Sequence, residues 1–533
     1  MGLPITRTGP AKFPLNRMPV ELVHMICGYL SPTEVASIRI MSSTVAAVGL
    51  EYIATTITLT LEEDSFDRLL EIAHHPIISQ HVHSLHYEHD FLTKLDRAEW
   101  EETIKTPELM AAENASLFGA RAPRLDTSER GWRAICRETA ALKAFHTYGK
   151  KRLDKAFLTY QEHCAEQEHA QRSDFFSNKL TNALQHLPNL RTIYMPMHGS
   201  YSRYQKEIAK LLQGAFYDQF CIQSESVAVT RSLLLAVDQA MHSGQNTNSP
   251  AASVGRETNS EGSNQSVLPI KSFNSESFNW RLFLEDDEVF TVMKRSISNL
   301  TKLGIRLLNG SWIKYPGSDS PLRFTRNLEA SRECLARRRL YEFVKSAPCL
   351  EEVNVSLCLN NQYSNIHLKD VVESFHWQSL KTVHFQRIKI DVGSLGEFCS
   401  RHSSTLSNLA LGDLQMPPTG SIHAGIGPWY TVFTEIREAT KLKEARVYGV
   451  FDIWERASWI MDYPADVWRA SGTLIGRYLV GEGGNSSLED FLDEEYLRLS
   501  EQEGKSSASK IDDDSNEIFP TSENQDLSSE SDA

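Results

Sequence analysis

The chain has 533 residues, of which 41% are hydrophobic and 23% charged, a composition typical of a folded protein with two or three domains. Its formal net charge of −14 is concentrated from residue 482 onward, where 16 acidic residues accompany three basic ones, so the preceding body is close to neutral. A body without a basic excess argues against nucleic-acid binding as the main function.

Membrane and secretion signals are not recognisable in the sequence. No run of about 18 apolar residues predicts a membrane-spanning helix, and the first 19 residues contain no apolar stretch typical of a secretory signal. The eight cysteines form no Cys-x-x-Cys pair and are typical of reduced core residues inside the cell. We therefore expect an intracellular protein, in the cytoplasm, the nucleus or both, that binds neither membrane nor nucleic acid.

Three short helices are predicted within residues 18–54, after a flexible N-terminal arm at residues 1–17. Pro19 suits the first position of a helix, where its missing N–H costs nothing. Apolar residues then recur at helical spacing as far as Leu30. The sequence Ser31-Pro32-Thr33-Glu34 is a capping box, in which the side chains of the first and last residue each accept the backbone N–H of the other. A second helix is therefore predicted to begin here, and a third after the following pair of serines.

This stretch resembles an F-box of the filamentous-fungal type. The resemblance rests on the order Met-Pro-x-Glu-Leu, an apolar helix, and then Ser-Pro-x-Glu-Val, over about residues 14–60. F-box domains bind the Skp-type adaptor of an SCF (Skp–cullin–F-box) ubiquitin ligase. The resemblance therefore implies an F-box domain at residues 18–60. It also implies that the adaptor-binding and core positions are Pro19, Leu22, Ile26, Leu30, Val35, Ile38 and Met41. The alternative is a plain three-helix subdomain packed on the body.

Six of the 18 histidines lie within residues 74–89, "HHPIISQHVHSLHYEH", and imidazole is a common metal ligand. The apolar spacing before and within this stretch predicts a helix followed by a strand through Val82-x-x-Leu85-x-Tyr87. A strand would place His81 and His83 on one face and His86 on the other, and no acidic or cysteine partner has metal-site spacing. We therefore expect no metal and no cofactor, and keep a metal-dependent hydrolase as the alternative.

Three further segments are distinguished by composition. Residues 55–61, "TTITLTL", alternate and predict a strand. The span of about 93–186 has apolar residues near helical spacing and charges of mixed sign, which predicts a helical insertion. Residues 243–266 are rich in Ser, Asn and Gly with almost no apolar residues, so we expect a disordered loop.

A weak repeat extends across residues 61–480. Each unit is a helical stretch followed by a Leu-x-x-Leu-x-Leu-like run, and six such runs begin at Leu190, Leu300, Leu350, Leu380, Leu406 and Leu442. A helix–strand unit with one apolar face must stack on its neighbours, as in a leucine-rich-repeat solenoid. We predict a mixed α/β fold, in which an N-terminal three-helix F-box precedes an irregular leucine-rich-repeat-like solenoid with helical insertions. An ordinary α/β domain is the alternative.

The C-terminal region combines tryptophans with an acidic end. We expect Trp429, Trp454, Trp459 and Trp468 to seal the last unit of the solenoid, with substrate anchoring as the alternative. Residues 481–533 are predicted to form an acidic disordered tail, which opens with the glycine-rich linker "GEGGNSS".

The resemblance implies a non-catalytic function. The sequence contains no P-loop, dinucleotide-binding or nucleophile-elbow motif. The F-box would bind the Skp-type adaptor and through it a cullin–RING ligase, and the repeat region would capture a protein substrate for ubiquitination through residues that the sequence does not identify. A second function compatible with this fold is that of an F-box and leucine-rich-repeat scaffold protein that delivers no ubiquitin.

Overall fold

The computed structural model describes residues 18–88, 96–98, 100–101, 150–172, 175–196, 223–242, 270–308, 333–335, 337–358, 366–372, 374–416, 427–453, 457–461 and 469–498. The predicted N-terminal arm and the predicted loop at 243–266 lie outside these residues. So do a large part of the predicted helical insertion, at 102–149, and the acidic sequence after residue 498.

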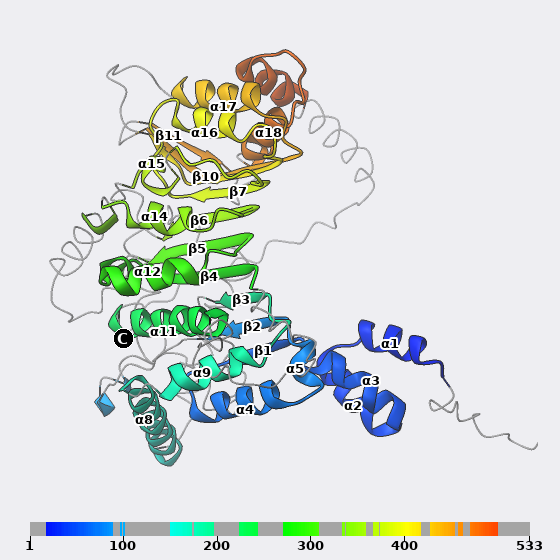
Figure 1. Ribbon diagram of the computed structural model, residues 1–533. Coiled ribbons are helices and arrows are strands. Elements are labelled where there is room, and N and C mark those ends of the chain that lie inside the picture. Colours follow the sequence, from blue (N-terminus) through cyan, green and yellow to red (C-terminus); the bar gives the residue numbers. More distant parts are fainter. Residues whose placement is uncertain are drawn as a thin grey trace, which may run out of the picture.

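The N-terminal helices form a separate small unit that projects from the body (Figure 1). Its elements are α1 (Val20–Tyr29), α2 (Pro32–Ile38), the 3₁₀ turn η2 (Arg39–Met41) and α3 (Ser43–Ile53). The predicted capping box is present, because the Ser31 N–H donates to Glu34 Oε2 at 2.7 Å and the Glu34 N–H donates to Ser31 Oγ at 3.4 Å. The unit has its own core of five buried side chains: Val23, Cys27, Val35, Val45 and Val48.

Nine strands of the body form one parallel sheet in which every strand lies beside its predecessor in the chain. They are β1 (Thr56–Leu59), β2 (Ser84–Tyr87), β3 (Thr192–Met195), β4 (Ser272–Asn279), β5 (Lys302–Leu308), β6 (Glu352–Cys358), β7 (Thr382–Gln386), β8 (Asn408–Gly412) and β10 (Glu444–Ile453). The short β9 (Gln415–Met416) pairs with β10, and β11 (Ala457–Met461) closes this edge in antiparallel orientation. This sequential order is the topology of a solenoid.

Helices follow the strands and stack along one side of the sheet (Figure 1). They are α4 (Glu63–His74), α9 (Phe175–Gln185), α11 (Gln223–His242), α12 (Asp287–Ser296), α14 (Arg339–Lys345), α15 (Leu368–Val371), α16 (Ser394–Arg401) and α17 (Gly427–Ala439), with α18 (Arg469–Leu479) at the end. Further elements are α5 (Ile78–His81), α8 (Lys150–Arg172) and η7 (Trp280–Leu284), and residues 488–498 form the last described helix. Alternate strand residues such as Leu85, Leu303 and Leu409 join these helices in one continuous core. Each unit therefore buries its apolar face against its neighbours.

The predicted repeat is confirmed as alternating helices and strands. The six predicted runs coincide with β3, β5, β6, β7, β8 and β10, and the run after the histidines is β2. Strand β4 was not predicted, because its segment "SFNSESFN" has no leucine and carries serines at two buried positions, Ser275 and Ser277.

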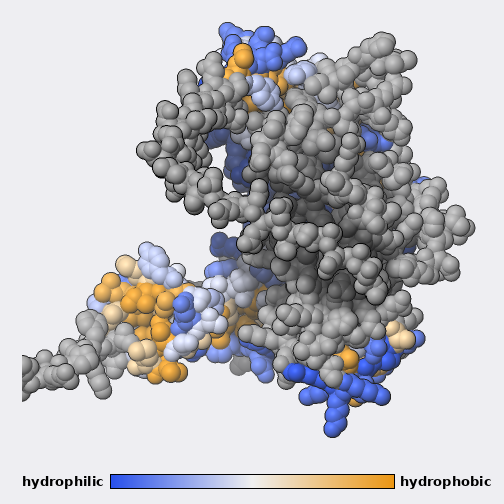
Figure 2. All heavy atoms as spheres, turned by 180° about the vertical axis from the view of Figure 1, so that it is seen from behind, coloured by the Kyte–Doolittle hydropathy of each residue, from blue (hydrophilic) through white to orange (hydrophobic). Residues whose placement is uncertain are grey.

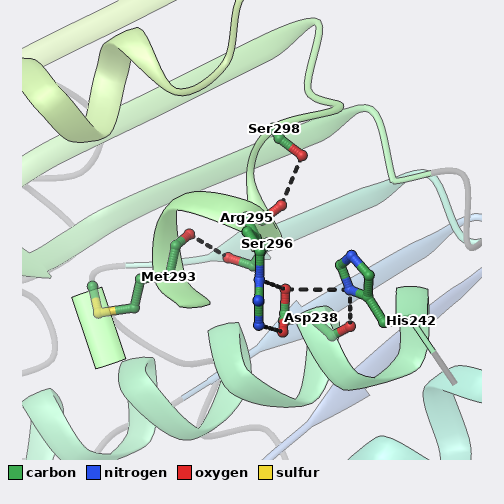
Figure 3. A network of polar contacts seen from close by, with 6 residues as sticks. All are labelled: Asp238, His242, Met293, Arg295, Ser296 and Ser298. Atoms are coloured by element: carbon green, nitrogen blue, oxygen red, sulfur yellow. Dashed lines mark hydrogen bonds and ion pairs between the residues drawn. The ribbon is translucent and has the colours of Figure 1, made fainter. Parts of the chain in front are cut away.

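A buried carboxylate joins two consecutive helices of the stack (Figure 3). Asp238 on α11 has a side chain only 6% exposed. It accepts two hydrogen bonds from Arg295 on α12, from Nε at 3.1 Å and from Nη2 at 2.8 Å. His242 Nδ1 lies 3.3 Å from the same carboxylate. The two hydrogen bonds to Asp238 raise the pKa of Arg295. Because the planar guanidinium binds both carboxylate oxygens, it fixes the position of α11 relative to α12.

Two predicted boundaries are wrong. Strand β1 pairs with β2, so residues 56–59 belong to the sheet and the three-helix unit ends near Ala54 rather than at residue 60. The acidic region also starts inside the fold, because residues 488–498 form a helix that buries Leu488, Phe491 and Leu492 in the main core. Its many carboxylates lie on the other face of an amphipathic helix, a pattern that net charge alone conceals.

The glycine-rich segment before this last helix is an ordered turn rather than a linker. Gly481, Gly483 and Gly484 all have positive φ, and the Arg437 guanidinium on α17 donates to the carbonyl oxygens of Gly484 and Ser486. The turn folds the last helix back onto the end of the solenoid.

One of the four predicted sealing tryptophans is described in full. Trp429 is completely buried, with its ring centroid 6.0 Å from that of Phe433 and 4.9 Å from that of Phe451. This bears out the sealing role for Trp429. Trp454 and Trp468 lie outside the described residues, and Trp459 lies on β11 opposite Phe451.

Candidate functional site

The three-helix unit leaves large apolar side chains in solvent. We call the following seven residues the exposed apolar surface: Val20, Leu22, Met25, Ile26, Tyr29, Ile40 and Met41. Tyr29 is 86% and Ile40 92% exposed. Figure 2 shows hydrophobic atoms gathered on this projecting unit. Single exposed apolar residues are ordinary, whereas a gathered set of this kind is typical of a contact site.

Helix α1 has two apolar stripes, and only one of them is buried. Val23 and Cys27 point into the small core. Leu22, Met25, Ile26 and Tyr29 follow each other at helical i, i+3, i+4 and i+7 spacing and are all exposed. Because the α1 sequence is apolar at seven of ten positions, the stripe that is free to meet a partner cannot be recognised from periodicity alone.

The structure separates the seven predicted site residues into two groups. Pro19, Leu22, Ile26 and Met41 are exposed, so they are available to a partner. Leu30 and Ile38 are half-buried against the small core, and Val35 is completely buried within it. The predicted site residues did not include Val20, Met25, Tyr29 or Ile40, because periodicity alone does not show which stripe of α1 is exposed.

The one cysteine of this unit is a core residue. Burial, with a smaller contribution from the Glu51 carboxylate, raises the pKa of the Cys27 thiol. The thiol therefore stays protonated near neutral pH and is a poor nucleophile.

The sheet face opposite the helices carries a second candidate site. Residues at one level of consecutive strands form what we call the middle row: Thr58, His86, Tyr194, Asn274, Gly304, Asn354, His384, Ala410 and Arg446. Their chain neighbours, such as Leu85 and Val353, point to the buried core, so the middle row lies on the face away from the described helices. The row contains no carboxylate, and its one permanently charged residue, Arg446, is at its C-terminal end.

A hydrogen-bonded network lies beside the C-terminal part of the middle row. Ser356 Oγ donates to Gln386 Oε1 at 2.8 Å, and Gln386 Nε2 donates to Asp413 Oδ2 at 3.0 Å. Arg387 Nε also donates to this carboxylate oxygen, at 3.2 Å. Gly449, whose φ is 84°, packs against Asp413. A Cβ at position 449 would lie 2.2 Å from Asp413 Oδ1, so a larger residue would displace this carboxylate. These contacts hold the polar side chains in fixed positions.

The middle-row residue His384 is paired with a tyrosine. His384 Nε2 hydrogen-bonds to the Tyr448 hydroxyl. Burial lowers the pKa of His384 and raises that of Tyr448, so both side chains are neutral near pH 7. The absence of a side chain at Gly412 makes room for the tyrosine, because a Cβ there would lie 2.5 Å from its ring.

The predicted strand in the histidine-rich segment is confirmed, but the expected placement of the histidines is partly wrong. His81 ends helix α5 and the strand begins at Ser84, so His86 is the strand histidine. Its ring centroid lies 5.2 Å from that of Tyr194, and burial lowers its pKa. Within the described ranges, no three His, Cys, Asp or Glu side chains are arranged to hold a metal ion.

Comparisons with known proteins add little to this description. No family model and no curated protein matches the sequence. A solved structure similar to this chain is the leucine-rich repeat-containing protein LegL7 from Legionella pneumophila, at 10% sequence identity and a TM-score of 0.24, with 81% of this chain and 99% of that chain covered. A likeness this weak carries no argument, so the description as a helix–strand solenoid rests on strand order and register. Of the helices in the described part, none is both long and apolar enough to span a membrane.

Proposed function

We propose that this chain is a substrate-recognition subunit of an SCF-type E3 ubiquitin ligase. In this proposal the three-helix unit binds the Skp-type adaptor, and through it a cullin–RING ligase, while the solenoid captures a protein substrate. The chain itself performs no catalytic step and works inside the cell, in the cytoplasm, the nucleus or both.

The exposed apolar surface is the observation that supports this proposal most directly. Four exposed side chains on one stripe of α1 stand beside a core of only five buried residues. A unit this small is weakly stable by itself and gains stability when a partner covers its apolar surface. Covering each such side chain contributes roughly 1.5–3 kcal/mol before the cost of association.

The shape of the rest of the chain supports the second half of the proposal. The described helices lie along one face of the solenoid sheet, and none of them lies on the other face. Faces of this kind bind extended partners. The three-helix unit and the solenoid have separate cores, so one is able to bind the adaptor while the other binds substrate.

Co-purification with a Skp-type adaptor tests the first half. We expect the full-length chain to retain the adaptor and the Leu22→Asp/Ile26→Asp variant to lose it at least tenfold, because a carboxylate in an apolar interface loses its hydration without a partner. Leu158→Asp is the matched control, since Leu158 is an exposed leucine on α8, and it should bind the adaptor normally. Equal binding by all three proteins would overturn the assignment of this surface.

The cullin distinguishes a ligase subunit from a scaffold. A scaffold that delivers no ubiquitin would retain the adaptor without recruiting the cullin. Recovery of the cullin with the wild-type chain and its loss with Leu22→Asp/Ile26→Asp supports the ligase, and adaptor without cullin supports the scaffold. Comparison of ubiquitin-modified proteins with and without the chain then identifies substrates.

A further inference from the structure

We propose that Met25 and Met41 are sites of reversible oxidation, and that conversion of their thioethers to sulfoxides by a peroxide prevents the three-helix unit from binding its adaptor. Both methionines belong to the exposed apolar surface. This inference names a regulation of the proposed adaptor-binding site and so rests on the proposed function, although the oxidation itself is measurable without the adaptor.

The methionines whose side chains the structure describes differ sharply in exposure. Met25 is 57% and Met41 is 61% exposed. Met18 is partly buried against the core of the small unit. Four others are buried in the core of the solenoid: Met195, Met241, Met293 and Met416. Because a dissolved oxidant must reach the sulfur, Met25 and Met41 should be oxidised first among these seven methionines.

The oxidation is a balanced exchange between a thioether and a peroxide. The methionine sulfur bonds to one oxygen atom of hydrogen peroxide, the O–O bond breaks, and the other oxygen leaves as water. The sulfur is oxidised by two electrons and the peroxide is reduced. Methionine sulfoxide reductases reverse the step, because the sulfoxide oxygen leaves as water while a pair of thiols becomes a disulfide.

Both sulfurs lie where a polar oxygen would interfere with an apolar contact. Met25 is in the middle of the exposed stripe of α1, three residues after Leu22 and four before Tyr29. Met41 ends η2 directly after the exposed Ile40. A partner that covers these side chains would strip water from the sulfoxide oxygens, and burial of a polar group without a hydrogen bond is unfavourable.

Oxidation at these two positions should change binding and leave the fold of the unit intact. Neither methionine belongs to the core of five buried side chains. The unit's one cysteine, Cys27, competes poorly for the peroxide, because it is buried and burial raises the pKa of its thiol. The sulfurs of Met25 and Met41 are therefore the exposed oxidisable groups of the described unit.

Graded peroxide treatment of the full-length chain tests the proposal, with peptide mapping by mass spectrometry and adaptor co-purification as readouts. We expect sulfoxide at Met25 and Met41 before Met195 and Met293, and adaptor binding weakened about tenfold or more once both are oxidised. Methionine sulfoxide reductases of both stereospecificities should restore binding. Dithiothreitol alone should not, because it reduces oxidised cysteines and leaves sulfoxides in place.

Two variants assign the effect to these sulfurs, each compared with its own untreated form. Met25→Leu/Met41→Leu keeps apolar side chains of similar volume without an oxidisable sulfur, so peroxide should change its adaptor binding by less than about twofold. Met293→Leu is the matched control at a buried methionine of α12, and it should remain as sensitive to peroxide as the wild type.

Three results would overturn the inference. The first is oxidation of the buried methionines as early as Met25 and Met41. The second is adaptor binding that survives oxidation of both residues, and the third is equal peroxide sensitivity of Met25→Leu/Met41→Leu and the wild type. An untreated chain that does not bind the adaptor would refute the proposed function and this regulation together, whereas binding that survives oxidation would refute the regulation alone.

Discussion

The three-helix unit exposes many of its apolar side chains, whereas the solenoid buries most of its own. The unit buries five residues and leaves side chains such as Tyr29 and Ile40 in solvent. The solenoid buries its apolar side chains in one continuous core and carries a polar row on the sheet face away from the described helices. The two regions therefore present different surfaces, apolar side chains on the unit and polar side chains on the sheet.

Size accounts for much of this difference. A repeat shares its core with the repeats before and after it, so the buried area grows with each unit added. Three short helices have no such neighbours and cannot enclose all of their own apolar residues. The two regions should therefore behave as separate folding units.

The largest effect is expected in the aromatic core of the solenoid. Phe343 is fully buried, and its ring centroid lies 5.6 Å from that of Phe278 and 5.9 Å from that of Phe283. Phe343→Ala should lower the free energy of unfolding by about 3–5 kcal/mol, through lost burial and the cavity left behind. Urea unfolding followed by circular dichroism measures this. Tyr29→Ala, an exposed aromatic control, should change it by less than about 0.5 kcal/mol. A loss below about 1 kcal/mol for Phe343→Ala would mean that the cluster is loosely packed.

The Asp238–Arg295 pair should respond asymmetrically. Arg295→Met keeps most of the side-chain stem but leaves the buried Asp238 carboxylate without its bidentate partner, which should cost about 2–3 kcal/mol. Asp238→Asn leaves Arg295 able to reach water, since its side chain is 54% exposed, and should cost about 1 kcal/mol. Urea unfolding of the two single variants and of the double variant gives the interaction free energy between Asp238 and Arg295. Equal losses would show that the carboxylate is better hydrated than its burial indicates.

Val35→Ala should destabilise the small unit alone. Val35 is fully buried in the five-residue core, and removal of two methyl groups should cost about 2 kcal/mol. Amide hydrogen exchange should then become faster across residues 20–53 and remain unchanged in β4–β8, because the two cores share no residue. Val20→Ala, at an exposed position of α1, is the control. Faster exchange in the central strands as well would contradict the separation of the two units.

The smallest effect is expected at one buried histidine and depends on pH. His402 Nε2 accepts a hydrogen bond from the backbone N–H of Trp377 at 3.1 Å. Nδ1 therefore carries the proton and donates to the Phe398 carbonyl oxygen at 2.9 Å. Burial lowers the pKa of His402. Below the ordinary pKa of about 6.5 the unfolded chain therefore binds a proton that the folded chain does not, and stability falls by up to about 1.4 kcal/mol per pH unit.

A pair of variants isolates this titration. His402→Gln should flatten the decline in stability between pH 6.5 and pH 5, at the cost of some stability at pH 7.5. Asn182→Gln, at an exposed residue of α9 that does not titrate, is the control and should leave the pH profile unchanged. If the His402→Gln profile is as steep as that of the wild type, another group is responsible for the acid sensitivity.

Local sequence determined much of the fold. The capping box at Ser31–Glu34, the six leucine-rich runs and the helices before them depend on short-range spacing, and the structure contains all of them. Strand β4 was missed because its inward positions include Ser275 and Ser277, which periodicity scores as polar. The helix at 488–498 was not predicted because most of its residues are acidic or polar. Its three buried apolar residues, Leu488, Phe491 and Leu492, lie on a single face.

The exposed apolar surface and the middle row depend on contacts between residues that are distant in the sequence. The sequence by itself predicted three helices and a repeat, and it carries the resemblance from which adaptor binding by Pro19 through Met41 is proposed, since these follow from residues close in the chain. Only the tertiary structure decided which apolar stripe of α1 is exposed, because α1 is apolar on two sides and α3 covers one of them. Only the register of the strands brought His86, Asn274, Asn354 and His384 into one row, because these residues are up to 298 positions apart and meet through stacking.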